Sequence, residues 1–489
     1  MALRSVGRLW RTVRHLRPVQ IYGRLGHWLP TRVPARGPAL PRRALPGAWL
    51  PSARREPSLV GPDRARFLSE ERPVGDPQAW NDASCAKLWL YNLHYFDDLQ
   101  AADADERAAW HRSLIARWVA ENPPPHGNGW EPYPVSLRLV NWSKWLLAGH
   151  APVPGMLESI AQQATWLTRR LEHHLLGNHL FANAKALVFV GVLLDGSAAE
   201  RWRDRGQSLL RRELPEQVLA DGGHFERSTM YHALALEDVL DLLNLEQASG
   251  RSLLPGLRTT AQRMAVWLQR MCHGDGEFGF FNDAALGIAP ATAELLAYAQ
   301  RLGVAVALAP PPASTLLQPS GYARLQLGDV CVLADVAPVG PDYLPGHAHA
   351  DTLSFEASHG NQRVLVNTGT SRYGLGPQRL HERGTAAHNT VTLDNHDSSE
   401  VWSGFRVGRR ARPVALARGE DAGRPWLQCG HDGYAWLPGR PLHLRRWALG
   451  AEGLQVDDEI RWQGRRPDPM PAAVARFHLH PSVQVGDCL

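Results

Sequence analysis

Cysteine is scarce in this chain, and the few cysteines form no recognisable motif. Five cysteines among 489 residues stand far apart, at positions 85, 272, 331, 429 and 488. An odd number without close spacing gives neither a disulfide framework nor a cysteine-based zinc motif. The distribution suggests a reducing compartment, or export by a route that the sequence does not show.

Long hydrophobic runs are also missing. No stretch of about 18 consecutive apolar residues occurs, so a transmembrane helix is not expected. Arginine and histidine interrupt every apolar stretch of residues 1–30, which excludes the apolar core of a secretory signal. With 44% hydrophobic and 21% charged residues, the chain has the composition of an ordinary globular protein, and its length allows two or three domains. A wholly disordered, collagenous or coiled-coil chain is excluded.

Positive charge is concentrated at the start of the chain. Residues 1–60 hold twelve arginines, no lysine and one acidic residue, Glu56, a balance of +11. Since the whole chain carries +5, the remaining residues sum to −6. The basic balance therefore belongs to this leader. Nucleic-acid binding is not expected, because the basic residues stand in a proline-rich leader and the body is acidic.

The leader, residues 1–60, allows two interpretations. Arginines at 4, 8 and 11 are followed by prolines at 30, 34, 38, 41, 46 and 51, a pattern that predicts a short basic helix and then an extended tether. The alternative is an ordered strap that packs over the next domain. A basic helix of this kind also allows peripheral contact with a membrane surface.

The rest of the chain divides into a helical part and a strand-rich part. Over residues 80–308, apolar side chains recur at helical spacing, as in Leu236, Val239, Leu240 and Leu243, and predict seven to ten helices in a toroid or an open array. The proline run at 309–313 indicates a linker. Over 314–489, short alternating runs with frequent turns predict an antiparallel β-sandwich that is short or truncated at its end.

The strongest chemical cluster is His347-Ala-His349-Ala-Asp351. On a strand, residues i and i+2 share one face, so both imidazoles could enter one site. The alternative is a set of unrelated surface histidines, since the chain has 22.

Four further segments combine polar side chains with a helix or a turn. Asn178 opens an apolar helix and is either an N-cap or a donor to a substrate carboxylate. Tyr231 lies early on another helix, where a buried tyrosine is the simpler interpretation. Asn282 and Asp283 follow two aromatic residues and could form an ordinary turn. Trp130 flanks a Pro/Gly loop, where its ring either stacks on a sugar or joins the core.

Together these segments resemble the heparinase II/III family of polysaccharide lyases, and most closely its bacterial members found with exopolysaccharide gene clusters. The resemblance runs from about residue 85 to 480 and is most specific over 347–402. It is carried by Asn178-His179, the segment from Glu226 to Tyr231, 347–355, Asn367-Thr-Gly369, and Arg383-Gly-Thr-Ala-Ala-His388-Asn-Thr-Val391. It implies a multidomain α and β fold, with an N-terminal (α/α) toroid followed by a C-terminal antiparallel β-sandwich.

The resemblance also implies β-elimination at a uronic acid in an acidic polysaccharide. This chemistry needs a group that neutralises the carboxylate, a base for the C5 proton and an acid for the leaving O4. The family pattern assigns Asn178, with His179 beside it, to the carboxylate. It assigns Tyr231 as the acid and as a candidate base, and His347 as a second base reaching the opposite face of the sugar. The residues expected to contact substrate are Trp130, Glu226, Arg227, Asn282, Asp283 and Arg383.

A structural zinc is the cofactor that the resemblance implies. His349 and His388 match two of its ligands, and Asn367 stands where the family usually has aspartate. An amide oxygen is an uncharged and poorer zinc ligand. We therefore expect weaker binding, compensation by Asp351 or a water, or no metal.

Two other functions remain open from the sequence. One is a non-catalytic polysaccharide-binding or assembly factor in exopolysaccharide biosynthesis, which the basic leader and Asn367 favour. The other is a glycoside hydrolase, with Glu226 and Asp283 as the two carboxylates that it needs. Family members often work in the cell envelope, although no export signal is visible.

Overall fold

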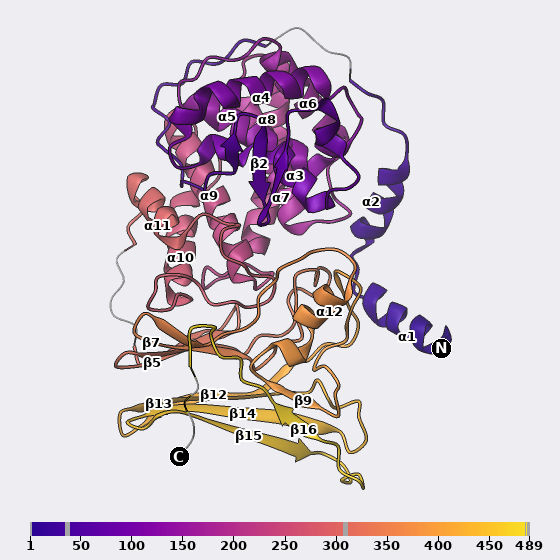
Figure 1. Ribbon diagram of the computed structural model, residues 1–489, viewed down its shortest axis with the longest axis vertical. Coiled ribbons are helices and arrows are strands. Elements are labelled where there is room, and N and C mark those ends of the chain that lie inside the picture. Colours follow the sequence, from indigo (N-terminus) through magenta and orange to yellow (C-terminus); the bar gives the residue numbers. More distant parts are fainter. Residues whose placement is uncertain (1, 35–39, 307–311, 485, 487–489) are drawn as a thin grey trace.

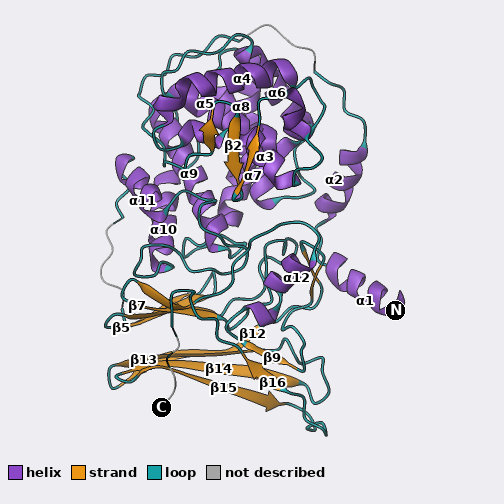
Figure 2. Ribbon diagram, in the orientation of Figure 1, coloured by secondary structure: helices purple, strands orange, loops and turns teal. Residues whose placement is uncertain are grey.

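The computed structural model describes residues 2–34, 40–306, 312–484 and 486. A helical domain stands over two layers of antiparallel sheet, and two N-terminal helices run along one edge of both (Figure 1). Figure 2 separates the two classes of structure: helices dominate residues before 306 and strands dominate those after 312. This is the predicted combination of an (α/α) toroid and a β-sandwich, and the prediction of the fold class is confirmed.

The helical domain is built around one buried helix, α7. Nearly every side chain of α7 from Leu180 to Leu193 is buried, and α7 packs against α5 and α8. A helix that is apolar on all sides is stable only inside such a ring of helices. The helices of this domain are α3 (Lys87–Tyr95), α4 (Ala108–Glu121), α5 (Pro132–Leu147), α6 (Met156–Arg169), α7 (Gly177–Leu193), α8 (Ser197–Gln217), α9 (Thr229–Ser249), α10 (Leu257–Arg270) and α11 (Thr292–Arg301).

A small antiparallel sheet precedes these helices and was missed by the sequence patterns. It consists of β1 (Leu59–Gly61), β2 (Arg64–Phe67) and β3 (Glu70–Pro73). Its strands β2 and β3 carry four charged, exposed side chains, which include the Arg64–Glu71 pair at 2.8 Å. Such strands carry little apolar alternation, so hydrophobic periodicity does not mark them.

The C-terminal domain contains two sheets packed face to face. The first has the order β4-β5-β6-β7-β8 and the second the order β12-β13-β14-β15, all antiparallel. Phe355 of the first sheet meets Trp447 of the second in the core between them, with ring centroids 6.2 Å apart. The strands are β4 (Ser314–Leu317), β5 (Tyr322–Leu327), β6 (Val330–Asp335), β7 (Phe355–His359), β8 (Gln362–Leu365), β12 (Pro413–Asp421), β13 (Arg424–His431), β14 (Pro441–Gly450) and β15 (Gly453–Trp462).

Shorter elements complete this domain around the loops that face the helices. They are α12 (Pro377–Arg383) and the strand pairs β9 (Val391–Leu393) with β16 (Ala473–Ala475) and β10 (Val401–Trp402) with β11 (Arg406–Val407). The long loop between β6 and β7 carries His347 and His349. Its residues are therefore placed by the packing of α12 and the neighbouring loops rather than by a strand ladder.

The two domains share an apolar cluster, which fixes how they sit against each other. Trp267 and Met271 of the helical domain pack with Tyr322 and Leu333 of the first sheet. The Trp267 Nε1–H also donates a hydrogen bond to Ser320 Oγ (2.9 Å). The linker predicted at 309–313 lies mostly outside the described residues.

The leader contains two helices and then an ordered strap. The helices are α1 (Ala2–Val13) and α2 (Pro18–Trp28), and residues 40–58 lie against the helical domain. The backbone N–H groups of Arg43 and Gly47 bond to the carbonyls of Leu193 and Ala248 (2.8 and 2.9 Å). Residues 40–58 thus form the ordered strap that was the alternative interpretation of the leader. The single basic helix predicted before them is in fact two helices, α1 and α2.

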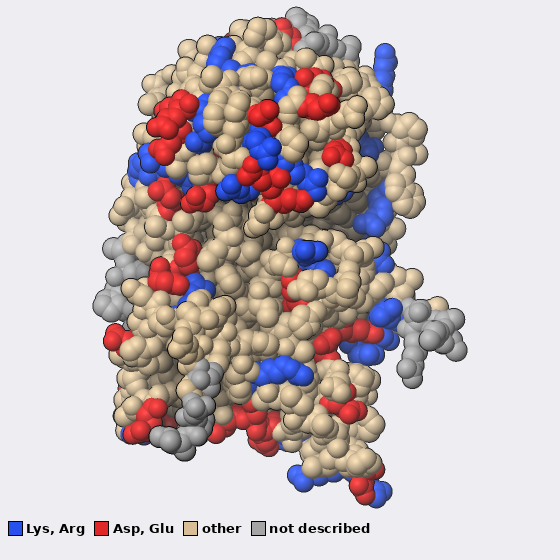
Figure 3. Space-filling view, viewed as in Figure 1, with Lys and Arg blue, Asp and Glu red and all other residues tan. Residues whose placement is uncertain are grey.

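The acidic body neutralises part of the leader. The guanidinium groups of Arg11, Arg17, Arg43 and Arg55 each pair with a body carboxylate: Glu400, Glu216, Glu200 and Glu237 respectively. Acidic and basic side chains also alternate over the visible face of the helical domain (Figure 3). In the described part of the chain, no helix combines the length and apolarity needed to cross a bilayer.

Candidate functional site

Tyr231 and His347 meet where the two domains join. Ser228 caps α9, and its hydroxyl accepts a hydrogen bond from the backbone N–H of Tyr231 (3.1 Å), which places Tyr231 in the first turn. The phenol ring lies flat against the imidazole of His347, with ring centroids 3.8 Å apart and an interplanar angle of 28°. Residues 116 positions apart in the sequence, one from each domain, therefore form a single surface.

Asn178 approaches the same place from the first turn of α7. The helix begins at Gly177 and its N-cap is Leu176, so Asn178 is not the cap. Gly177 has φ of +52°, and a Cβ there would overlap the side chain of Leu344, in the loop that leads to His347. Glycine is required on both counts. Asn178 lines a small pocket together with Tyr133, Tyr231 and His224.

His179 lies beside this pocket. Its Nδ1 lies 3.1 Å from Glu172 Oε1, and its ring packs against Tyr133 with centroids 4.4 Å apart. Burial opposes protonation, but the charge and hydrogen bond of Glu172 outweigh it and raise the pKa of His179. Glu172 thus favours the protonated form of His179, the form that suits an anionic ligand beside Asn178.

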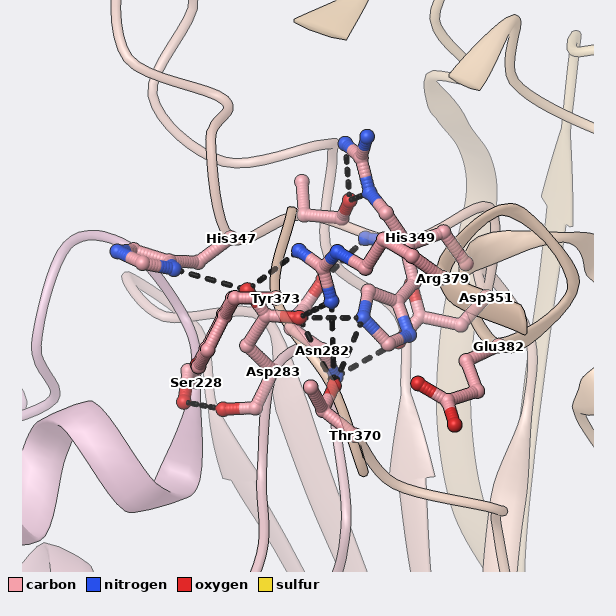
Figure 4. A network of polar contacts seen from close by, with 12 residues as sticks. Ser228, Asn282, Asp283, His347, His349, Asp351, Thr370, Tyr373, Arg379 and Glu382 are labelled. Carbon is pink, nitrogen blue, oxygen red and sulfur yellow. Dashed lines mark hydrogen bonds and ion pairs between the residues drawn. The ribbon is translucent and has the colours of Figure 1, made fainter. Parts of the chain in front are cut away.

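Asp283 is the hub that fixes the histidines (Figure 4). Its carboxylate is fully buried and accepts from His347 Nδ1 (2.9 Å), His349 Nε2 (2.8 Å) and Thr370 Oγ1 (2.9 Å), while the guanidinium of Arg379 binds both oxygens. Burial opposes ionisation, but these hydrogen bonds and the charge of Arg379 hold the pKa of Asp283 well below its usual range. The ionised carboxylate orients His347 with Nδ1 as donor and Nε2 free to accept a proton.

The Tyr231 hydroxyl is kept protonated. Burial first, and then the neighbouring Tyr373 and Asp283, raise the pKa of Tyr231 well above its usual value. Its hydroxyl oxygen lies 3.2 Å from that of Tyr373. A neutral phenol at this position suits proton donation better than proton removal.

Glu226 adds a carboxylate next to His347. Its Oε2 lies 3.6 Å from His347 Nε2, and the side chain is 2% exposed. Burial raises the pKa of Glu226, although the neighbouring histidines oppose the shift. Glu226 is thus part of the site, beside the nitrogen that would act as base.

Two residues expected to contact substrate are buried elsewhere. Trp130 is 3% exposed, its Nε1–H donates to the carbonyl of Asn122 (3.1 Å), and its ring packs near that of Trp118. The prediction that it stacks on a sugar is wrong, because the Pro/Gly loop folds the ring into the aromatic core. Arg383 is fully buried and donates to the carbonyl of Ala348 (2.9 Å). It holds the segment between His347 and His349 and does not reach a ligand.

Arg227 and Asn282 brace the site instead of facing a substrate. Both have left-handed backbones, with φ of 60° and 58°. The Asn282 amide donates to the carbonyl of Arg227 (2.9 Å) and accepts from the backbone N–H of His349 (3.0 Å). Arg227 Nε donates to the carbonyl of Ser320 (3.0 Å), across the domain junction. The predicted contacts of these two residues with substrate are therefore not supported by their geometry.

Comparison with known proteins gives the family. The family model described as "Heparinase II/III N-terminus" matches residues 94–299, and the model described as "Heparinase II/III-like, C-terminal" matches residues 309–488. The chain belongs to the heparinase II/III family. This membership confirms the resemblance identified from the sequence.

Two curated relatives and one solved structure show how much of this chain is shared with known proteins. FtsZ-localized protein C of Caulobacter vibrioides is 29% identical over 452 residues, covering 84% of this chain and 72% of the relative. A heparin-sulfate lyase of Bacteroides stercoris is 25% identical over 301 residues, covering 56% of this chain and 45% of the lyase. The crystal structure of Heparinase III superposes with a TM-score of 0.61 at 17% identity, covering 81% of this chain and 65% of that one. The chain thus spans less than half of the Bacteroides stercoris lyase. The likeness to Heparinase III supports the fold alone.

The ligand set expected for the family's zinc is only partly assembled. His349 Nδ1 and His388 Nε2 face each other at 3.2 Å, close to the roughly 3.3 Å between two nitrogens on one tetrahedral zinc. Asn367 is not the third ligand, because its Oδ1 lies 3.2 Å from His388 Nδ1, on the far side of the imidazole. Asp351 accepts from the backbone N–H of Asn282 (3.1 Å). Among the described residues, no three His, Cys, Asp or Glu side chains are grouped to hold a metal.

Arg379 and Tyr373 are site residues that the sequence did not reveal. Arg379 lies 96 residues from the carboxylate that it binds, and Tyr373 lies 142 residues from Tyr231. Neither stands in a recognised motif. The signal available was weak: an arginine just after Gly376-Pro377, which starts the short helix α12.

Proposed function

We propose that this protein is a polysaccharide lyase that cleaves a uronate-containing acidic polysaccharide by β-elimination. The observation that carries the proposal is the contact between Tyr231 and His347, with Asn178 in the same pocket. These three groups come from α9, the β6–β7 loop and α7, and they supply an acid, a base and an amide donor at one point. Family membership supports the same chemistry.

The geometry supports a definite division of roles. The Asn178 amide and a protonated His179 would neutralise the uronate carboxylate, which makes the C5 proton more acidic. His347 Nε2 would remove that proton, because Asp283 holds the Nδ1–H on the other side of the ring. The neutral Tyr231 hydroxyl would protonate the departing O4.

The ring contact also bears on which face of the sugar is attacked. No sugar fits between Tyr231 and His347 when their rings are 3.8 Å apart. The expectation that His347 approaches from the face opposite Tyr231 does not fit this arrangement. Base and acid lie on the same side, which favours syn elimination, in which the C5 proton and the O4 group leave from one face.

The direct test is the product. The purified full chain is expected to generate an unsaturated uronate, seen as new ultraviolet absorbance, on at least one polymer of a panel that includes heparin, heparan sulfate and bacterial exopolysaccharides containing uronate. Mass spectrometry would show chain ends without added water. Saturated reducing ends, or no cleavage of any uronate polymer, would contradict the proposal.

A non-catalytic polysaccharide-binding role is the second candidate, and two observations favour it. Glu226 places a carboxylate beside the proposed base, and Asp238 lines the same pocket, so the site is less cationic than a uronate site requires. The relative FtsZ-localized protein C is named for a location and not for a reaction. Polymer binding without new chain ends, unchanged by Tyr231→Phe, would select this function.

The structure argues against a glycoside hydrolase, because one of the two candidate carboxylates, Asp283, is not available to a substrate. Asp283 is fully buried and already bound by Arg379, His347 and His349. A hydrolase needs two carboxylates that both reach the scissile bond. Glu226 alone does not meet that requirement.

We also propose that His349 and His388 bind a structural zinc, with Asn367 orienting His388. A neutral imidazole has one N–H, yet acceptors face both nitrogens of His388: Asn367 Oδ1 at Nδ1 and His349 Nδ1 at Nε2. Burial lowers the pKa of His388 to about 3 and that of His349 to about 4, so both rings are neutral. A cation held between the two nitrogens would relieve this mismatch.

Zinc binding is expected to depend on His388 and far less on Asn367. Elemental analysis of the purified chain should give about one zinc per molecule, His388→Ala should remove it, and Asn367→Ala should weaken it by about 10–100-fold, as for an orienting residue. His359→Ala, at an exposed histidine, is the matched control. Retention of the metal by His388→Ala, or complete loss in Asn367→Ala at saturating zinc, would contradict this assignment.

A further inference from the structure

Both leader helices turn an apolar face away from the protein. We call this set of side chains the leader stripe; from Val6 to Leu29 its members are between 36% and 73% exposed. Exposed apolar residues scattered singly are ordinary, but a continuous series on two successive helices marks a contact surface. The leader stripe consists of Val6, Leu9, Trp10, Val13, Ile21, Tyr22, Leu25, Trp28 and Leu29.

Helix α1 rests on the protein by its polar side. Arg11 forms two hydrogen bonds with Glu400 (2.8 and 2.9 Å), and Thr12 Oγ1 accepts from Trp402 Nε1 (3.1 Å). Arg8 lies over the Trp402 ring, 4.7 Å from its centroid. At 100° per residue these three side chains lie opposite the apolar ones. A surface helix normally buries its apolar side, so α1 is inverted relative to the usual arrangement.

Helix α2 is oriented in the same way. Its inner side carries one apolar residue, Val19, which packs on the helical core, and otherwise small or polar groups. Gly23 packs against the backbone of His174, and Gln20 donates to the carbonyl of Tyr343 (3.1 Å). The His27 ring packs against that of His174, with centroids 4.4 Å apart and an interplanar angle of 35°. Ile21, Tyr22, Leu25 and Trp28 follow i, i+1, i+4 and i+7 and point outward. Two successive helices thus contact the protein mainly through polar and small groups and leave the side chains of the leader stripe exposed.

The charged side chains of the leader itself all have one sign up to residue 55. Residues 1–55 contain no acidic residue. Arg14 and Arg24 are exposed, and among the described residues neither forms an ion pair with a carboxylate. Basic side chains follow the edge of the molecule where α1 and α2 lie (Figure 3). Apolar and aromatic side chains flanked by unpaired arginines are typical of helices that lie in the surface of an anionic bilayer.

We infer that α1 and α2 dock this protein on an anionic lipid bilayer through the leader stripe. Tryptophan and tyrosine favour the boundary between headgroups and acyl chains. Trp10, Trp28 and Tyr22 would lie there, while Arg14 and Arg24 contact lipid phosphates. The inference is independent of the proposed lyase activity.

Docking would also place the candidate site close to the bilayer. The guanidinium of Arg17 in the leader lies over the Tyr343 ring, 3.6 Å from its centroid, and pairs with Glu216. Tyr343 belongs to the loop that continues to His347. The leader and the site are thus joined through one loop, and a polymer at the membrane surface would be within reach.

The test is cosedimentation of the full chain with vesicles. We expect binding to vesicles of phosphatidylglycerol mixed with phosphatidylcholine, and weaker binding to phosphatidylcholine alone. Leu9→Gln with Trp10→Gln and Leu25→Gln should lower the partition coefficient about tenfold or more. Arg14→Glu with Arg24→Glu should lower it about tenfold or more on the anionic vesicles alone. All five side chains are exposed, so the fold should not change.

A matched control carries three apolar-to-glutamine changes at exposed positions elsewhere: Leu286, Leu416 and Met470, which are 50%, 40% and 62% exposed. It should bind vesicles like the wild type. The inference is wrong if the wild type does not bind anionic vesicles, or if the stripe variant binds equally well. It is also wrong if the wild type is a dimer that the stripe variant dissociates, with no vesicle binding, because the stripe would then be a contact between copies of the chain.

Discussion

Replacing Tyr231 by phenylalanine is expected to lower the rate of polysaccharide cleavage by about 10²–10⁴-fold, the usual contribution of a general acid. The substitution removes one oxygen atom and keeps the ring that stacks on His347 at 3.8 Å. Because the stacked surface persists, polymer affinity should change little and the loss should fall on kcat. Initial rates of ultraviolet product formation, measured over a range of polymer concentrations, would separate the two.

The matched control for this variant is Tyr22→Phe. Tyr22 is 62% exposed on α2 and does not line the α9 pocket, so its hydroxyl should have no part in the reaction. Its rate should equal that of the wild type. If Tyr231→Phe retained more than about a tenth of the activity, Tyr231 would not be the acid. A neighbouring hydroxyl, with Tyr373 as the first candidate at 3.2 Å, would then have to supply the proton.

The second large effect is expected from Asp283→Asn, which should lower the free energy of unfolding by about 3–5 kcal/mol at pH 7. The variant keeps the shape of the side chain but leaves the Arg379 guanidinium, itself 2% exposed, without its counter-charge. It also replaces one of the two carboxylate oxygens by an NH2 group, so His347 and His349, which bind different oxygens, no longer both have an acceptor. Chemical denaturation would measure the stability, and the lyase rate should fall with it because His347 loses its orientation.

The stability difference between the wild type and Asp283→Asn should depend on pH, and the direction follows from the pKa of Asp283. The folded-state pKa of Asp283 is depressed, so its contribution to stability is complete above the unfolded value of about 3.9 and is lost as pH falls further. The difference in stability between wild type and Asp283→Asn should therefore narrow below about pH 4. Asp105→Asn, at a side chain that is 95% exposed, should change stability by about 0.5 kcal/mol or less. Equal stability of wild type and Asp283→Asn at pH 7 would show that the Asp283 carboxyl group is not ionised.

The sequence placed the candidate residues on their elements best where a motif and an element end coincide. Asn178 and Tyr231 each stand in the first turn of an apolar helix. His347 stands in the most specific segment of the family resemblance. The helical periodicity and the later strand alternation were strong enough to give the toroid and the sandwich, because each is repeated over many elements.

The sequence predicted side-chain environments poorly. Trp130 and Arg383 have the composition of ligand-binding residues, yet both are buried in the protein. Whether an aromatic or a guanidinium group faces solvent depends on how the loop that carries it closes. Asn367 matched a ligand position, but its oxygen is turned to the outer nitrogen of His388. Spacing along the chain does not specify these orientations.

What the sequence by itself determined is the distribution of charge, the order of the two domains and the residues able to support elimination. The +11 leader and the −6 body are properties of composition. What only the tertiary structure decided is which of these groups meet. It pairs Arg11 with Glu400 and Arg379 with Asp283, and it leaves Arg14 and Arg24 exposed beside an apolar stripe. The physical reason is that ion pairs and ring contacts act over a few ångströms, so their partners are set by packing between distant segments and not by neighbours in the chain.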